Sequence, residues 1–303
     1  DEIAALGVDV MVVPMYRFFG PIRDLKMAYD LYRLFRREKF NVVINFSTKP
    51  NIYGTIAAFM AAVPKRLFHV VGMGSTFLPQ PTMKGKILRR AFIALYRIAC
   101  SLTHKVWFTN KNDLAFFVEH GMIAHKNTVL TKNYLDTNYY LPLEYDSPEL
   151  VDLRDELGLT DEKVVVMVAR MIWAKGVREF AEAAIRLSSH HRGLVFILIA
   201  PLAEGSADEV PESYIRRVEE LANLRWFGFR KDVISFYGIA DIAVLPTYYK
   251  EGGYPRALLE PMSMGKPVIG TESEDCRGAV DHGKDGYLIP VKDSDALAEA
   301  VED

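Results

Sequence analysis

Apolar residues recur along this sequence in short runs, and longer amphipathic segments separate the runs. The runs in the second half are Lys163–Val168, Gly193–Ala200, Leu224–Phe227, Asp241–Pro246, Val268–Thr271, Gly278–Val280 and Tyr287–Pro290. The segments between them place apolar residues three or four positions apart, which predicts helices over Val177–Ser188, Glu212–Ala222 and Asp293–Val301. Strands that alternate with helices predict a parallel α/β sheet.

The first half shows the same alternation. Its predicted strands are Val8–Pro14, Asn41–Phe46, Arg66–Val71, Lys105–Asn110 and Thr128–Thr131, and its predicted helices are Asp24–Lys39, a small-residue helix to about Ala62, Met83–Thr103 and Asp113–His120. The segment Leu141–Pro148 is rich in proline and acidic residues, so it predicts a linker between the halves. We therefore expect two α/β domains, residues 1–146 and 147–303.

Length and composition agree with two globular domains. The chain has 303 residues, of which half are hydrophobic and a quarter are charged. Cys100 and Cys276 form neither a disulfide framework nor a metal-ligand spacing, so we expect reduced thiols, a cytoplasmic location, and no metal or cofactor. The sequence has no run of 18 apolar residues that would predict a membrane span. Nothing in it predicts a nucleic-acid partner.

Charge is distributed unevenly between the halves. Residues up to Asp146 include 19 basic and 11 acidic residues, and the remainder includes 18 basic and 28 acidic residues. In the predicted helix Met83–Thr103, apolar residues alternate with cations at Lys84, Lys86, Arg89, Arg90 and Arg97. Two interpretations stay open: an interfacial helix that contacts the anionic inner face of the cell membrane, or an ordinary solvated helix over a core.

The stretch Lys250–Thr271 combines a glycine loop with a helix start. Glu251 opens the loop, Pro255 suits the first helical position, and Glu260 lies on the helix. Free N–H groups at a helix start attract anions, and carboxylates accept hydrogen bonds from sugar hydroxyls. The alternative is that Glu251 is a solvated loop residue and Glu260 only pairs with a neighbouring cation.

Two cations are predicted at the same sheet edge as these carboxylates. In open α/β sheets ligands bind at the carboxyl ends of the strands. Arg170 and Lys175 follow one predicted strand there, and the Gly228–Asp232 loop follows another. Cations for a diphosphate together with carboxylates for hydroxyls fit a nucleotide-sugar, although two solvated surface cations would give the same pattern.

Three segments of the second half resemble the C-terminal domain of glycosyltransferase family 4: Val168–Gly176 (VARMIWAKG), Leu224–Thr271 and Asp281–Pro290. Ile44–Ala58, His69–Phe77 and Val106–Phe117 resemble bacterial transferases of surface-polysaccharide and lipid-linked-oligosaccharide assembly. The resemblance implies a GT-B fold, in which two Rossmann-like domains face each other across a cleft. It also implies a retaining, metal-independent transferase that moves a sugar from a nucleotide-sugar, with UDP as the expected nucleotide, to a glycan or polyprenyl-linked acceptor.

The resemblance also implies roles for particular residues. Arg170 and Lys175 would bind the donor diphosphate, Glu260 would hold the ribose hydroxyls, and Glu251 would meet the donor sugar. With no nucleophile pattern in the sequence, we expect catalysis from Glu251, Arg170 and Lys175. The remaining expected contacts are backbone N–H groups of Gly252 and Gly253 on the donor, and Gly72, Gly74 and His69 on the cleft side of the first domain.

The sequence departs from the family pattern at several places. Glu251 and Glu260 enclose eight residues where the family has seven, and Pro261 falls inside the predicted helix. A first strand with its glycine loop is missing before Val8, and a closing helix is missing after Asp303, so we expect a fragment with an incomplete N-terminal domain. These departures keep two alternatives open: a catalytically silent partner subunit, and a nucleotide-sugar epimerase of the same fold.

Overall fold

The structure is a computed structural model that describes residues 5–16, 20–72 and 82–303. It divides into two compact units, Asp1–Lys132 and Asn133–Asp303. The division therefore precedes the boundary expected at Asp146. The reason lies in the contacts of the intervening segment, because Asn133 Nδ2 donates to the Tyr254 carbonyl at 2.7 Å and the Tyr140 carbonyl accepts from Ser263 Oγ at 2.8 Å.

The first unit contains a four-stranded parallel sheet in the order β1-β2-β3-β4. Its strands are β1 Val42–Phe46, β2 Lys65–Val70, β3 Lys105–Phe108 and β4 Thr128–Leu130, and its helices include α2 Pro21–Glu38, α3 Thr55–Met60, α4 Met83–Leu102 and α5 Lys111–Glu119. The core joins Phe68 and Phe108 of the sheet to Tyr96 of α4 and Phe117 of α5. A π-helix, Pro50–Gly54, follows β1 and leads into α3.

The second unit contains a six-stranded, entirely parallel sheet in the order β10-β9-β8-β5-β6-β7. Its strands are β5 Lys163–Val168, β6 Leu194–Ile199, β7 Leu224–Phe227, β8 Ile242–Val244, β9 Val268–Thr271 and β10 Gly286–Ile289. Its helices are α6 Pro148–Glu156, α7 Val177–Ser188, α8 Glu212–Leu221, α9 Val233–Ile239, α10 Arg256–Ser263, α11 Glu274–Arg277 and α12 Ser294–Glu302.

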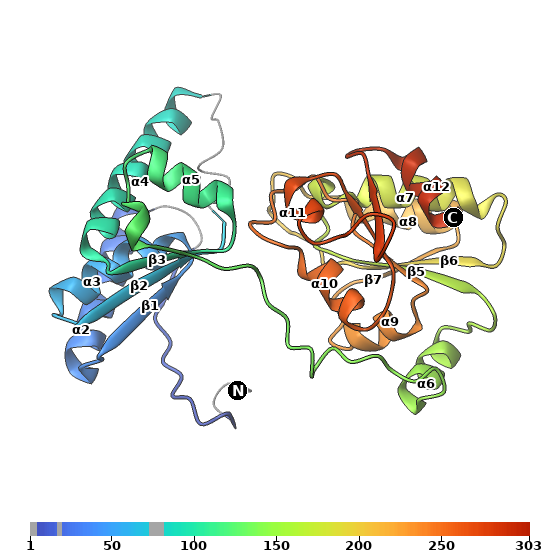
Figure 1. Ribbon diagram of the computed structural model, residues 1–303, viewed down its shortest axis with the longest axis horizontal. Helices are drawn as coiled ribbons and strands as arrows, with labels where there is room; N and C mark the ends of the chain where they lie inside the picture. The colour runs from blue at the N-terminus through green and yellow to red at the C-terminus, as the bar shows by residue number, and fades with distance from the viewer. Residues whose placement is uncertain (1–4, 17–19, 73–81) are drawn as a thin grey trace. The chain divides into compact units, whose positions relative to one another are not determined.

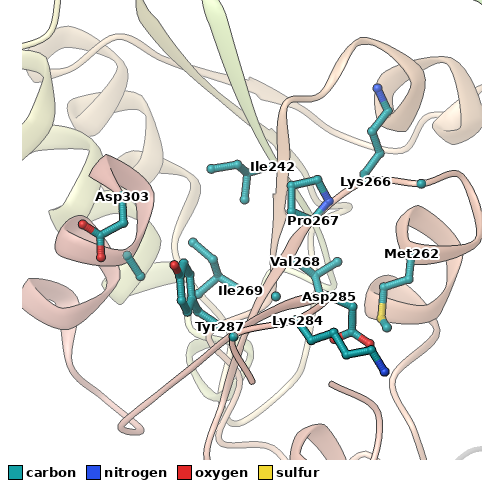
Figure 2. Close-up of a pocket in the computed structure, with 14 residues that line it drawn as sticks. Ile242, Met262, Lys266, Pro267, Val268, Ile269, Lys284, Asp285, Tyr287 and Asp303 are labelled. Carbon is teal, nitrogen blue, oxygen red and sulfur yellow. The ribbon is translucent and has the colours of Figure 1, made fainter. Parts of the chain in front are cut away.

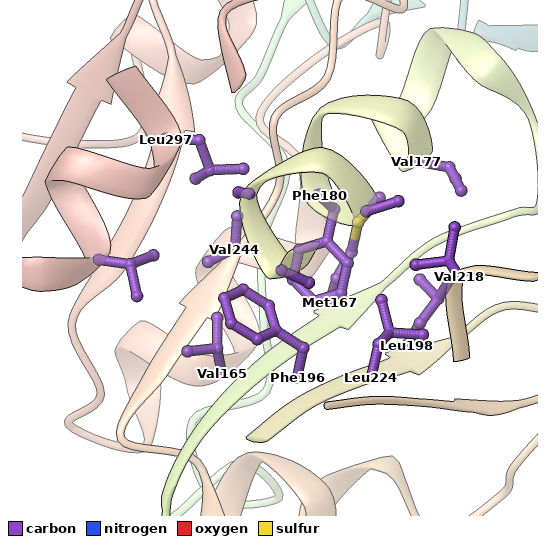
Figure 3. Close-up of a cluster of buried hydrophobic side chains, with 14 of the residues drawn as sticks. Val165, Met167, Val177, Phe180, Phe196, Leu198, Val218, Leu224, Val244 and Leu297 are labelled. Carbon is purple, nitrogen blue, oxygen red and sulfur yellow. The ribbon is translucent and has the colours of Figure 1, made fainter. Parts of the chain in front are cut away.

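Helices cover both faces of this second sheet (Figure 1), with α7, α8 and α12 on one face and α6, α9 and α10 on the other. On the α7 face, the Phe180 ring of α7 meets the Phe196 ring of β6 edge-on with centroids 5.3 Å apart, beside Leu297 of α12 (Figure 3). Burial on both faces explains why these strands read as continuous apolar runs in the sequence. Because all six strands are parallel, their carboxyl ends lie at one edge of the sheet.

Several expectations differ from the structure. Val8–Pro14 was expected to be a strand, but it pairs with no strand among the described residues, and its Val12 side chain is 88% exposed. A run of β-branched residues forms a strand only where a neighbouring strand accepts it. Gly278–Val280 lies in a turn after α11 rather than in a strand, and the short helices α6 and α11 were not predicted. As the sequence predicted, Pro261 lies inside α10, which ends two residues later at Ser263.

Candidate functional site

The loop after β5 is tied closely to the end of β8. Arg170 and the short 3₁₀ turn Trp173–Lys175 leave β5, and Gly176 then begins α7 with φ of +83°. A Cβ atom at Gly176 would lie 2.2 Å from the Pro246 carbonyl oxygen, so glycine is needed here for both its conformation and its size. This close approach fixes Lys175 beside the segment that follows β8.

Lys175 and Glu251 form a buried ion pair at the carboxyl edge of the sheet. The Lys175 ammonium lies 2.6 Å from Oε1 and 2.5 Å from Oε2 of Glu251, and the two side chains are only 13% and 10% exposed. Thr247 Oγ1, which is fully buried, donates to Glu251 Oε1 at 2.9 Å. The structure therefore brings together the phosphate cation and the sugar carboxylate of the sequence hypothesis, and the two side chains bind each other.

The contacts of Glu251 limit what else it can bind. Oε1 accepts from Lys175 and from Thr247, which uses both of its lone-pair directions, whereas among the described residues Oε2 accepts from Lys175 alone. One acceptor direction is left on Oε2. Glu251 can thus accept a hydrogen bond from a single further donor, such as one sugar hydroxyl, while its pair with Lys175 stays intact.

Arg170 lies near Lys175 because both cations contact the ring of Tyr249. Its guanidinium carbon lies 5.2 Å from the centroid of the Tyr249 ring, and the Lys175 ammonium lies 5.3 Å from that centroid. Cations are attracted to the electron-rich face of an aromatic ring, so Tyr249 helps to hold two positive charges near each other. Arg170 is exposed, whereas Lys175 is largely buried, so Arg170 is the cation more accessible to an incoming anion.

The glycine loop is closed by a carboxylate that the sequence did not indicate. The N–H groups of Glu251 and Gly252 donate to Oδ2 of Asp275, at 3.0 and 3.2 Å. Burial raises the pKa of Asp275 above its ordinary value. The Gly252 N–H group, which was expected to contact the donor, thus donates to a carboxylate of the chain itself, and its role toward the donor stays a prediction. The contact of Asp275 with the glycine loop could not be predicted from the sequence, because an acidic residue between predicted elements is usually only solvated.

Glu260 lies apart from the Lys175–Glu251 pair. Its Oε1 accepts from Arg256 Nε at 2.9 Å, one turn earlier on α10, and Arg256 Nη2 donates to the Tyr140 hydroxyl at 3.2 Å. The Glu260 side chain is 13% exposed, and burial raises its pKa. The pairing with a neighbouring cation matches the alternative interpretation of Glu260, and among the described residues no hydrogen bond joins Glu260 to Lys175 or Glu251.

The Gly228–Asp232 loop also lies at the carboxyl edge, after β7. Arg230 is held by Asp232 at 2.6 Å and by Glu156 at 3.4 Å, and the Phe229 side chain is 72% exposed. Gly228 has open space where a Cβ atom would stand. The loop thus offers an exposed aromatic ring and accessible backbone at the carboxyl edge of the sheet.

The candidates of the first unit are partly outside the described residues. His69 is the penultimate residue of β2 and is 8% exposed, with its ring stacked on Trp107 at 4.2 Å and edge-on to Phe46 at 5.5 Å. Burial lowers the pKa of His69, and neither ring nitrogen has a partner among the described residues. Gly72 has φ of +114°. Gly74 lies outside the described residues.

The opposite edge of the second sheet contains a cavity of about 640 Å³ (Figure 2). It lies at the amino ends of β8, β9 and β10 and is lined by Lys266, Tyr287 and Asp303 among others. None of the predicted donor-site residues lines it. Within the described residues there is also no cluster of three or more His, Cys, Asp or Glu side chains that could hold a metal ion.

Comparison with known proteins identifies the second unit. Residues 162–303 match the protein family described as "Glycosyl transferases group 1". The second unit carries a glycosyl transferases group 1 domain. The chain is therefore a glycosyltransferase, and its glycine loop, Lys175–Glu251 pair and α10 all belong to that domain.

Curated relatives match almost the entire chain. An N,N'-diacetylbacillosaminyl-diphospho-undecaprenol alpha-1,3-N-acetylgalactosaminyltransferase from Campylobacter jejuni is 27% identical over 99% of this chain and 77% of that relative. A UDP-Gal:alpha-D-GlcNAc-diphosphoundecaprenol alpha-1,3-galactosyltransferase from Escherichia coli is 25% identical over 99% of this chain and 74% of that relative. The capsular polysaccharide biosynthesis glycosyltransferase CapM of Staphylococcus aureus is 26% identical over 96% of this chain and 74% of that relative.

Solved structures agree on the fold. A glycosyltransferase from Rickettsia africae superposes with a TM-score of 0.78 at 19% identity, over 99% of this chain and 76% of that chain. Anabaena HepE in complex with UDP-glucose gives a TM-score of 0.74 at 21% identity, over 93% of this chain and 73% of that chain. The architecture is that of the GT-B glycosyltransferases, which confirms the fold class expected from the sequence.

Proposed function

We propose that this glycosyltransferase moves a sugar from a UDP-sugar to a lipid-diphosphate-linked acceptor in the assembly of a cell-surface polysaccharide. The observation that carries the proposal is the gathering of Arg170, Lys175 and Glu251 at the carboxyl edge of the second sheet, around Tyr249. The relatives support the two substrate classes, because one names a UDP-sugar donor and two name diphospho-undecaprenol acceptors.

In the proposed reaction the cations stabilise the departing diphosphate. Arg170 would bind phosphate oxygens as a planar fork, and Lys175 would use the hydrogen that it does not donate to Glu251. Both charges are fixed before the reaction, so negative charge that develops on the leaving group meets donors that need no rearrangement. The acceptor hydroxyl would attack from the side of the departing diphosphate and pass its proton to it, which retains the configuration at the sugar.

The test of this proposal is UDP release from a panel of UDP-sugars, each with and without a diphosphate-linked lipid acceptor. We expect release with one or a few donors and a marked acceleration by the acceptor. Matched reactions with GDP-sugars and ADP-sugars control for the base. Binding without release would favour a silent partner subunit, and a changed sugar with UDP still attached would favour an epimerase.

Helix α4 has an exposed apolar and basic surface that suits contact with a membrane, where a lipid-linked acceptor would lie. Phe92, Tyr96 and Ala99 of α4 are buried in the first core, while Met83 is 72% and Ile87 is 60% exposed. Lys86 and Arg90 are exposed along the same helix. We propose that this surface contacts anionic lipid at the inner face of the cell membrane, because exposed apolar residues interleaved with cations favour such an interface. No helix within the described ranges has the length and apolar character needed to cross a bilayer.

Sedimentation with vesicles tests the membrane proposal. We expect binding to vesicles that contain phosphatidylglycerol and little binding to pure phosphatidylcholine. The double variant Lys86→Glu/Arg90→Glu should lose the difference, while Lys163→Glu, on the second unit, should keep it. Equal binding of all three proteins would contradict the proposal.

A further inference from the structure

The glycine loop is anchored to the sheet edge by one side chain. Asp275, in the first turn of α11, receives the N–H groups of both Glu251 and Gly252 on its Oδ2. Two N–H donors that converge on one oxygen form a small anion-binding pocket in the backbone. Here the anion belongs to the chain itself.

The other end of the loop is fixed independently. The Tyr254 carbonyl accepts from Asn133, and a Cβ atom at Gly278 would lie 2.3 Å from the Tyr254 ring. Between these two anchors lie Gly252 and Gly253, both with positive φ. Glycine loses more conformational freedom on ordering than any other residue, so this segment depends on its anchors.

Glu251 is consequently held twice, by its backbone and by its side chain. Asp275 fixes the N–H of Glu251, while Lys175 and Thr247 fix its carboxylate. If the Asp275 anchor is released, Tyr254 stays bound to Asn133, but the start of the loop then depends on the flexible side chain of Glu251. We propose that Asp275 is a positioning residue: it holds the Glu251–Tyr254 loop so that the Glu251 carboxylate stays on Lys175 and presents its free Oε2 direction to the donor sugar. This inference rests on the proposed function for its catalytic consequence, but not for its structural one.

Three variants test the inference. Asp275→Ala removes the anchor, Asp275→Asn keeps an oxygen that can accept both N–H groups, and Glu272→Ala removes an exposed carboxylate of the neighbouring loop as a control. Amide hydrogen exchange of the segment 249–256 is measured first, because it needs no substrate. Asp275→Ala should speed exchange at Glu251 and Gly252 about tenfold or more, whereas Asp275→Asn and Glu272→Ala should stay close to the parent.

Turnover with the donor found in the UDP-release panel is measured next. Asp275→Ala should lower kcat about tenfold to a hundredfold and leave the Kd of UDP within about threefold, because Arg170 and Lys175 remain. Asp275→Asn should recover most of the loss. A merely structural role would lower UDP binding and kcat together and would not separate the two variants.

These measurements separate a failure of the inference about Asp275 from a failure of the proposed function. Unchanged exchange in Asp275→Ala overturns the inference whatever the enzyme does, and so does a loss of UDP binding as large as the loss of kcat. If the parent protein transfers no sugar from any donor, the proposed function fails, and the exchange data still decide whether Asp275 holds the loop.

Discussion

Lys175 and Glu251 neutralise each other's charge at a position where both side chains are largely buried. Transfer of an ion from water to a protein interior costs several kcal/mol, and a well-bonded partner offsets that cost. Removal of one partner leaves the other charge buried and unpaired. A substitution in this pair therefore affects folding stability in addition to its effect on function, and the two effects must be measured separately.

Arg170 and Lys175 should differ in this respect. Arg170→Ala should weaken UDP binding by about 1.5–3 kcal/mol and leave uridine binding and the melting temperature nearly unchanged, because Arg170 is exposed and only the diphosphate needs it. Lys175→Ala should weaken UDP binding and also lower the melting temperature, because Glu251 loses its cation. Calorimetric titration with UDP and uridine, together with thermal unfolding, measures both. Equal losses for UDP and uridine would show that these cations are not phosphate ligands.

The two glutamates should separate in binding. Glu260→Ala should weaken UDP and UDP-sugar alike, by about 1–3 kcal/mol, if Glu260 meets the ribose. Glu251→Ala should spare UDP and lower transfer, because its one open acceptor direction serves the sugar. Titration of both variants with UDP decides the matter. A loss of UDP affinity in Glu251→Ala as severe as in Glu260→Ala would remove Glu251 from the sugar-binding role.

Glu179, in the first turn of α7, predicts a pH effect on stability. It is 5% exposed, its Oε2 has no partner among the described residues, and burial raises its pKa above the ordinary 4.5. A carboxyl whose folded-state pKa is raised favours folding at low pH, and that contribution is lost as pH rises from the unfolded to the folded value. Glu179→Gln should therefore gain melting temperature over the parent at pH 7.5 and gain little at pH 4.5. An equal shift at both pH values would contradict this sign.

At the scale of elements, burial decided what could be predicted. The bounds of β5, β7, β9 and α7 were predicted from the sequence as the structure has them, because buried strands are continuous apolar runs and α7 has a clear helical period. The turn α11 spans four residues, too few for a period to appear, and the Asp275 contact depends on it. Val8–Pro14 has the composition of a strand, but no strand pairs with it among the described residues, and a local sequence pattern does not report whether a partner strand is present. The positions of Lys175 and Glu251 followed from motifs, whereas their mutual pairing depends on tertiary contacts.

The junction of β5 and α7 offers a matched pair of glycine substitutions. Gly176→Ala should destabilise the protein by more than about 2 kcal/mol, since it adds a clash with the Pro246 carbonyl to the strain of positive φ. Gly158→Ala, with φ of +57° and open space around the new methyl group, should cost only about 1 kcal/mol. Urea unfolding of both variants measures the difference. Similar losses would mean that the backbone shifts to accommodate the methyl group.

At the scale of the whole molecule, each unit has its own core, and the segment Asn133–Ser147 belongs to the second. Tyr140 packs on that core and Asn133 bonds to the glycine loop. A chain that begins at Asn133 should therefore melt several degrees above one that begins at Ser147, although both contain the whole second sheet. Thermal unfolding of the two chains checks this, and equal melting temperatures would place the boundary where the sequence predicted it.

The strand order of the second sheet has a consequence for synthesis on the ribosome. β5, β6 and β7 are neighbours in both sequence and sheet, so they can pair as soon as they emerge. The other edge of β5 stays unpaired until β8 has been synthesised. The Val164 N–H group of β5 also donates a hydrogen bond to the side chain of Asp241, which lies 77 residues later and directly precedes β8. Until then the nascent chain exposes an apolar strand edge, the kind of surface that recruits chaperones or other copies of the chain. Slow translation between Phe227 and Asp241 should lengthen that exposure and lower the yield of folded protein.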